Sequence, residues 1–202
     1  MMKLFTILVI CLLVACSTKI PTRYYNLNAL QGSTIMDSLP SDTSLGIGPV
    51  KLPSMLNRKG IVTHKSGPSV QVASHDIWAG RLKEDFSRVV AELMAQSLGI
   101  NDVVTEPWNT RFRPEYQLQL DVQHFSGQLG GDVRFKVNWT LSGNYGKDKI
   151  ASRTDDITLQ TNGDTYQAYV STLNALLAAF SEKTIRTEIS NEIKNHPSNK
   201  HN

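Results

Sequence analysis

Two stretches of strict alternation between apolar and polar residues constrain the fold of this chain more than any other feature. The apolar positions are Tyr116, Leu118, Leu120 and Val122 in the first stretch, and Val133, Phe135, Val137, Trp139 and Leu141 in the second. A period of two predicts strands with one dry face and one solvated face. Residues 127–132 supply a turn between them, and a third strand is predicted at about 149–159. The result is an antiparallel sheet whose dry face must be covered.

Two helices are predicted to cover that face. The first runs from about residue 77 to residue 98, because apolar residues recur there at steps of three and four, with Asp76 as its N-cap and Gly99 at its end. The second begins at a capping box formed by Asp164 and Gln167. Its apolar stripe is Tyr166, Tyr169, Val170, Leu173, Leu177 and Phe180, continued by Ile185, Ile189 and Ile193.

Shorter strands are predicted between the amino-terminal part and the first helix. Residues 45–50 form one of them, and Ile61–Thr63 and Val70–Val72 flank a turn and read as a hairpin. Together these elements predict an α+β fold, namely a mainly antiparallel sheet with two main helices packed on one face. After a lipidated tether, the remaining length suits a single domain.

The amino-terminal residues predict a signal peptide and a lipid anchor. Lys3 precedes an almost wholly apolar run, which is shorter than the roughly 20 residues that cross a bilayer. The run ends at Leu13-Val14-Ala15-Cys16, which resembles the lipobox of bacterial lipoproteins. Because the other cysteine, Cys11, lies in the part to be removed, Cys16 is left without a disulfide partner, and lipidation of its thiol explains it.

The expected organisation follows from this cleavage site. Residues 1–15 are the signal peptide, 16–43 a lipidated tether with one short ordered piece at Tyr24–Leu27, 44–195 the α+β domain, and 196–202 a disordered tail. The second mature residue is Ser17, whereas in enteric-type bacteria an aspartate there resembles an inner-membrane retention signal. We therefore expect the protein to face the periplasm from the outer membrane, to which the acyl chains hold it.

Enzymatic, cofactor and metal signals are weak. Ser74, His75 and Asp76 have the residue types of a triad, but neighbours in sequence do not converge as a triad does. The five histidines lack metal-ligand spacing, so no metal and no cofactor is expected, and His124 is expected at the edge of the core. Removal of Lys3 leaves 20 basic against 18 acidic residues, mixed along the chain, which does not favour a nucleic-acid partner.

Several segments in order resemble one family, the auxiliary lipoproteins of ABC-type lipid transport systems (the PqiC-like group). The segments are the lipobox at Cys16, Tyr24–Leu27, Val50–Arg58, Ile61–Thr63, and Trp78-Ala79 with Leu82. The resemblance covers most of the chain. It implies a non-enzymatic lipoprotein that docks an MCE-domain periplasmic protein to the outer membrane, with a homo-oligomer as one form that it can take.

The positions that carry this resemblance are the candidate partner-binding residues. They are Leu52, Pro53, Leu56, Arg58 and Trp78, to which we add Trp108 because a tryptophan in a loop often marks a contact. Leu52, Leu56 and Trp78 are also ordinary core residues, which is the alternative interpretation. Three other functions stay open: a chaperone of secretion or envelope assembly, a hydrolase of envelope polymers, and a domain that itself binds lipid.

Overall fold

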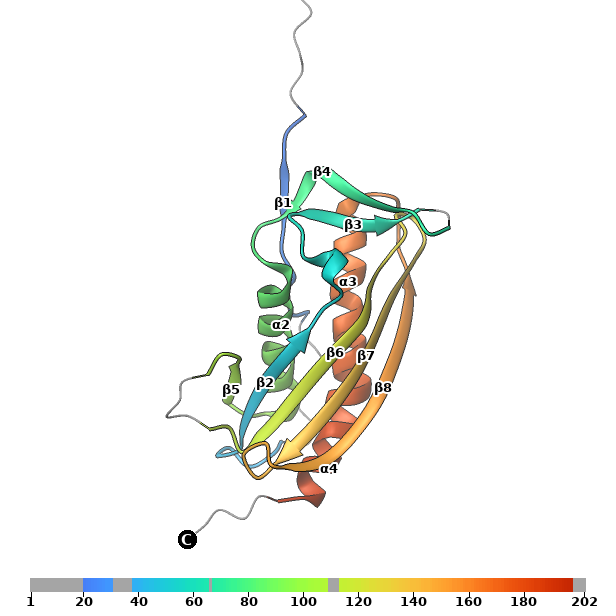
Figure 1. Cartoon of the computed structure of the whole chain (residues 1–202). Coiled ribbons are helices and arrows are strands. Elements are labelled where there is room, and N and C mark those ends of the chain that lie inside the picture. Colours follow the sequence, from blue (N-terminus) through green and yellow to red (C-terminus); the bar gives the residue numbers. More distant parts are fainter. Residues whose placement is uncertain (1–19, 31–37, 66, 109–112, 198–202) are drawn as a thin grey trace, which may run out of the picture.

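The fold is organised around a long mixed sheet with two helical segments on one of its faces (Figure 1). The computed structural model describes residues 20–30, 38–65, 67–108 and 113–197. The large sheet has the strand order β5-β2-β6-β7-β8, and a three-stranded sheet has the order β1-β4-β3. The strands are β1 (Arg23–Tyr25), β2 (Ser44–Lys51), β3 (Gly60–His64), β4 (Val70–Trp78), β5 (Asp102–Thr105), β6 (Tyr116–Gly127), β7 (Asp132–Gly143) and β8 (Asp148–Gln160).

Strands β6, β7 and β8 form the predicted antiparallel meander. The register pairs Leu120 with Trp139 and Leu118 with Leu141, so that the alternating apolar residues of both strands share one face. All nine of them are buried. The prediction of one dry face is therefore confirmed, because the alternation of side chains along a strand is a local property.

One expectation on this sheet is wrong. A β-bulge between Val122 and His124 shifts the register of β6. Since the bulge adds one residue, the alternation changes phase, and His124 is exposed while Phe125 is buried. His124 is therefore a surface residue and does not lie at the edge of the core.

The other half of the large sheet is parallel. Strand β2, predicted at 45–50, lies parallel to β6 on one side and to β5 on the other. The short strand β5 was not predicted, since its four residues show no alternation long enough to be recognised. The sheet is thus mixed, and β5 forms the edge beside helix α2 (Leu82–Leu98).

The small sheet contains the predicted hairpin, because β3 and β4 are antiparallel neighbours. Strand β4 continues to Trp78, and the predicted helix start at residue 77 is wrong. Asp76 is not a helix cap; its buried carboxylate accepts hydrogen bonds from Arg23 and Tyr25 of β1. This pairing with β1 spans more than 50 residues of sequence and holds residues 76–78 in a strand.

The second helix is one continuous helical segment with a π-helical part. It consists of α3 (Tyr166–Phe180), the π-helix η2 (Ser181–Ile189) and α4 (Ser190–Asn195). The apolar stripe steps by five residues from Phe180 to Ile185, and the wider π-helical turn keeps both residues buried. The N-cap is Thr165, whose hydroxyl accepts a hydrogen bond from the Ala168 N–H at 3.2 Å, so the predicted cap at Asp164 is wrong by one residue.

The core joins both helices to the sheet through four phenylalanines. Phe86 of α2, Phe125 of β6, Phe135 of β7 and Phe180 of α3 meet in edge-to-face and tilted pairs with centroid distances of 5.2–6.0 Å. Both helices lie on the same side of the large sheet (Figure 1), which confirms the α+β fold. The signal peptide, Cys16 and residues 198–202 of the tail lie outside the described residues.

Candidate partner-binding groove

A groove of about 760 Å³ lies where three segments meet: residues 52–59 after β2, the start of α2, and residues 105–107 after β5. Four of the predicted partner-binding residues line it, namely Leu52, Pro53, Leu56 and Arg58. They are local neighbours in the sequence, but the opposite wall comes from residues 80–87 and 105–107. The structure therefore places the segment that carries the resemblance along one side of an open groove.

The segment 52–59 is held by a single turn of 3-10 helix, η1 (Ser54–Leu56). The backbone N–H groups of Leu56 and Asn57 donate to the carbonyls of Pro53 and Ser54 at 2.9 and 3.1 Å. Leu56 is only 4% exposed and anchors the turn in the core, whereas Arg58 is exposed. Arg58, two residues after the turn, thus lines the groove as an exposed residue.

The charges around the groove are mostly basic. Arg58, Lys59, Arg81 and Lys83 line it together with Glu84 and Glu106. Arg81 forms an exposed ion pair with Glu84 at 2.9 Å, and such a pair contributes little to stability. The groove combines apolar side chains from Leu52, Pro53 and Leu56 with a net positive edge. This combination is suited to binding an apolar and acidic element of another protein.

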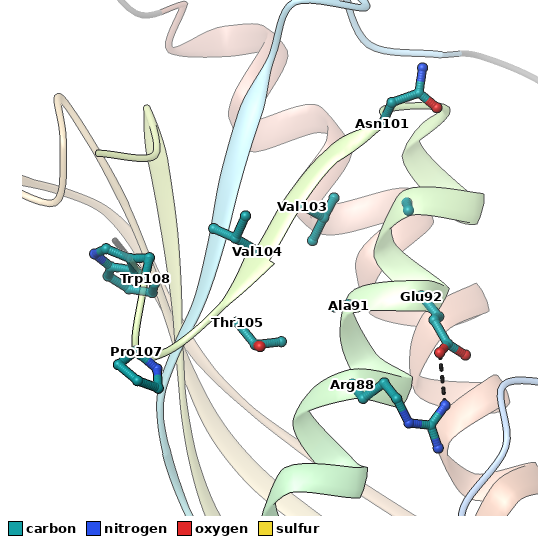
Figure 2. A pocket seen from close by; sticks show the side chains of 10 residues that line it. Arg88, Ala91, Glu92, Asn101, Val103, Val104, Thr105, Pro107 and Trp108 are labelled. Atoms are coloured by element: carbon teal, nitrogen blue, oxygen red, sulfur yellow. Dashed lines mark hydrogen bonds and ion pairs between the residues drawn. The ribbon is translucent and has the colours of Figure 1, made fainter. Parts of the chain in front are cut away.

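A second hollow of about 610 Å³ adjoins the groove, because Thr105 and Pro107 line both. Figure 2 shows Arg88 and Glu92 of α2 across from residues of β5 and the segment that follows it. Arg88 donates to Glu92 and Asp85, both at 2.7 Å, and these hydrogen bonds, that to Asp85 foremost, raise the pKa of Arg88.

Trp108 lines this second hollow and is half-buried (Figure 2). A Cβ placed on Gly46 of β2 would lie 3.0 Å from the Trp108 ring and 2.5 Å from Pro114 Cγ. The backbone of β2 therefore lies close beneath the tryptophan. Trp108 is partly a packing residue and partly open to a partner.

Trp78 is the predicted site residue that lies apart from both hollows. It ends β4, is 6% exposed, and its backbone N–H donates to the carbonyl of Lys59 at 2.8 Å. It supports the groove segment from behind through this hydrogen bond. The binding roles of all six candidates stay predictions.

Several residues of the groove were not foreseen from the sequence, among them Arg81, Lys83, Glu106 and Pro107. Placing the helix start at residue 77 put Arg81 and Lys83 inside a helix rather than at its beginning. Glu106 and Pro107 follow β5, which was not predicted. No local pattern relates these positions to residues 52–59, because only the tertiary fold brings them together.

Asp76 and His64, an acid and a histidine near the small sheet, make structural contacts. Asp76 is occupied by Arg23 and Tyr25, as described above, and His64 Nε2 lies 2.8 Å from Ser126 Oγ, which links the β3–β4 hairpin to β6. Among the described residues, no group of three or more His, Cys, Asp or Glu side chains is placed to hold a metal ion. Within the same part of the chain, none of the helices combines the length and the apolar character that crossing a membrane requires.

Comparison with known proteins extends these observations. The profile of the ABC-type transport auxiliary lipoprotein component family matches residues 25–184. A crystal structure of an uncharacterized protein superimposes with a TM-score of 0.67 at 21% identity, covering 86% of this chain and 99% of that one. A DUF330 protein from Xanthomonas campestris gives a TM-score of 0.69 at 17% identity with the same coverage, 86% and 99%. Both similarities show a shared fold.

A PelC dodecamer from Paraburkholderia phytofirmans is less similar, with a TM-score of 0.43 at 14% identity over 80% of this chain and 92% of that chain. No curated protein sequence matches the chain.

Proposed function

Because the chain belongs to the ABC-type transport auxiliary lipoprotein component family, we propose that it is a non-enzymatic subunit that docks an envelope transport assembly to the outer membrane. In this proposal the transporter is of the MCE type and moves lipid or other hydrophobic molecules between the two membranes. The acyl chains on Cys16 hold the subunit in the outer membrane, and its domain lies in the periplasm. Ser17 after the anchor supports this location, since it is not the aspartate of inner-membrane retention.

The groove at residues 52–59 is the observation that carries the docking role. Its apolar side chains are half-buried or buried in the domain, while Arg58 remains exposed at the edge. The groove offers apolar contacts with a mostly basic edge, which is the composition of a binding surface.

The partner that fits this groove is a projecting apolar element with acidic residues on the MCE-domain protein. Leu52 and Pro53 contribute apolar contact area, and Arg58 contributes a planar fork of donors that can bind a carboxylate with two hydrogen bonds. Complementary charge also speeds association and disfavours unrelated partners.

A pull-down from detergent-solubilised envelopes tests the proposal. The tagged wild type, Cys16→Ala, Arg58→Glu and the control Lys149→Glu are compared; Lys149 is an exposed lysine of β8 and does not line the groove. We expect the wild type and Lys149→Glu to recover an MCE-domain protein. Arg58→Glu should recover about tenfold less, equivalent to about 1.4 kcal/mol of binding free energy.

Cys16→Ala should be lost from the outer-membrane fraction, while its groove should still recover the partner from the solubilised envelopes. If the wild type recovers components of secretion or envelope assembly and no MCE-domain protein, the transport role is wrong, and the alternative of an assembly chaperone takes its place. Equal recovery by Arg58→Glu and Lys149→Glu would place the docking surface elsewhere.

A further inference from the structure

Exposed large apolar side chains gather at one end of the molecule. Of the six in the described part of the chain, four belong to the three-stranded sheet or to the residues that lead into it. They are Ile20 (65% exposed), Tyr24 (68%), Val70 (47%) and Val72 (42%), and we call them the apolar patch. Scattered single apolar residues are normal on a protein surface, but a group at one end marks a contact.

The geometry of β4 explains why this face is open. Ala73 and Asp76 are both buried, although they are three positions apart and would point to opposite sides of a regular strand, so the strand changes the side that it turns toward the domain. The register of the β3–β4 pair shifts over the same residues, between Gly60 and Val62 of β3. Val70 and Val72 stand two apart and therefore lie on the same side of the strand, and both side chains are exposed.

Strand β1 is firmly attached to this sheet. Arg23 forms an ion pair with Asp76 at 2.8 Å, and the carbonyl of Tyr25 accepts from the N–H of Ala79 at 2.7 Å. Just beyond it, Leu27 is fully buried, and its N–H donates to Asp85 at 2.8 Å. Residues 23–27 are thus part of the folded body, and β1 turns Tyr24 outward.

The short distance from Cys16 to β1 limits how the domain can stand on a membrane. Arg23 is seven positions after Cys16, and a fully extended chain of seven residue steps spans at most about 25 Å. Strand β7 alone, with 12 residues, spans roughly 40 Å. The long strands run between the end with β3 and β4 and the opposite end with α4 (Figure 1). An acylated Cys16 therefore keeps the three-stranded sheet as the end nearest to the membrane.

The charge of this end also suits a membrane. In residues 20–28 and 59–79 the basic residues are Arg23, Lys59 and Lys65, and the acid is Asp76, which is buried against Arg23. Asp132 and Arg134, one acid and one base, line the hollow beside Lys65. The lysines are exposed. Basic residues near an anionic leaflet are attracted to its phosphates.

We propose that the apolar patch rests on the anionic phospholipid surface that holds the acyl chains of Cys16. Ile20, Tyr24, Val70 and Val72 enter the headgroup region, while Lys65 faces the phosphates. The contact holds the domain with its long axis pointing away from the membrane. The opposite end, with α4, then projects into the periplasm. This inference rests on the acylation of Cys16 in the proposed function.

The test uses the acylated full-length protein, reconstituted in vesicles of phosphatidylethanolamine and phosphatidylglycerol. Val72→Cys and the control Tyr145→Cys each carry one polarity-sensitive fluorophore; the acylated thiol of Cys16 does not react with the label. Val72 and Tyr145 are 42% and 45% exposed, but Tyr145 lies in the turn between β7 and β8. We expect nitroxide lipids to quench the probe at position 72 several-fold more than the probe at position 145.

Each result decides between the two proposals. If the protein floats with the vesicles and both probes are quenched equally weakly, the membrane contact is wrong and the anchor stands. If the mature protein carries no acyl mass and does not float, the anchor and the contact both fail. Replacing phosphatidylglycerol with phosphatidylcholine should reduce the quenching at position 72, and an unchanged value would overturn the role of anionic headgroups.

Discussion

Tyr169 joins the two sheets to helix α3, and removal of its hydroxyl group tests how much this junction contributes to stability. The hydroxyl donates to the carbonyl of Val62 in β3 at 3.1 Å and accepts from the N–H of Gly127 in β6 at 3.0 Å. Tyr169→Phe keeps the ring and leaves both backbone groups without this partner in a region from which water is excluded, since Tyr169 is 1% exposed.

The expected loss follows from these two groups. An unsatisfied buried polar group costs about 1–3 kcal/mol, so we expect the two groups left by Tyr169→Phe to lower the free energy of unfolding by about 2–6 kcal/mol. With a urea slope of about 2 kcal/mol per molar for a domain of this size, the midpoint should fall by about 1–3 M. Urea unfolding of the mature chain, followed by circular dichroism, measures this shift.

Tyr166→Phe is the matched control on the same helix. The Tyr166 hydroxyl is buried and has no hydrogen-bond partner among the described residues, so its removal should leave the midpoint unchanged or raise it slightly. The reasoning is refuted if Tyr169→Phe unfolds at the same urea concentration as the wild type. It is also refuted if both variants lose the same stability.

Three further outcomes are expected. Burial raises the pKa of Tyr169, so the tyrosine ionises at a lower pH in the unfolded chain than in the folded one. The free energy of unfolding should therefore fall as the pH rises above about 10, and it should fall less steeply in Tyr169→Phe. Urea titrations at stepped pH measure this dependence. Thr165→Ala should cost about 1 kcal/mol because the N-cap is lost, whereas Asp164→Ala should change stability by less than about 0.5 kcal/mol; equal losses in urea unfolding would contradict this assignment. Gly46→Ala should cost about 1–3 kcal/mol because the new Cβ would lie 2.5 Å from Pro114 Cγ, and an unchanged melting temperature would show that the segment moves aside freely.

One wall of the candidate groove could be predicted from the sequence, and the facing wall could not. Leu52, Pro53, Leu56 and Arg58 stood out because a continuous segment carries the family resemblance, and this segment lines the groove. The facing wall did not stand out, because α2 and the residues after β5 approach the segment only through the packing of β2 beside β5. A groove between distant segments leaves no spacing pattern in any one of them.

What the sequence by itself determined is what depends on neighbours along the chain: the dry faces of β6 and β7, the β3–β4 hairpin and the apolar stripe of α3. Alternation and helical spacing are local periodicities, so they can be read without a partner. Tertiary structure alone decided that Asp76 belongs to a strand, since Arg23 and Tyr25 bind its carboxylate across more than 50 residues. It also decided that His124 is exposed, because pairing with β7 places a bulge that local pattern does not encode.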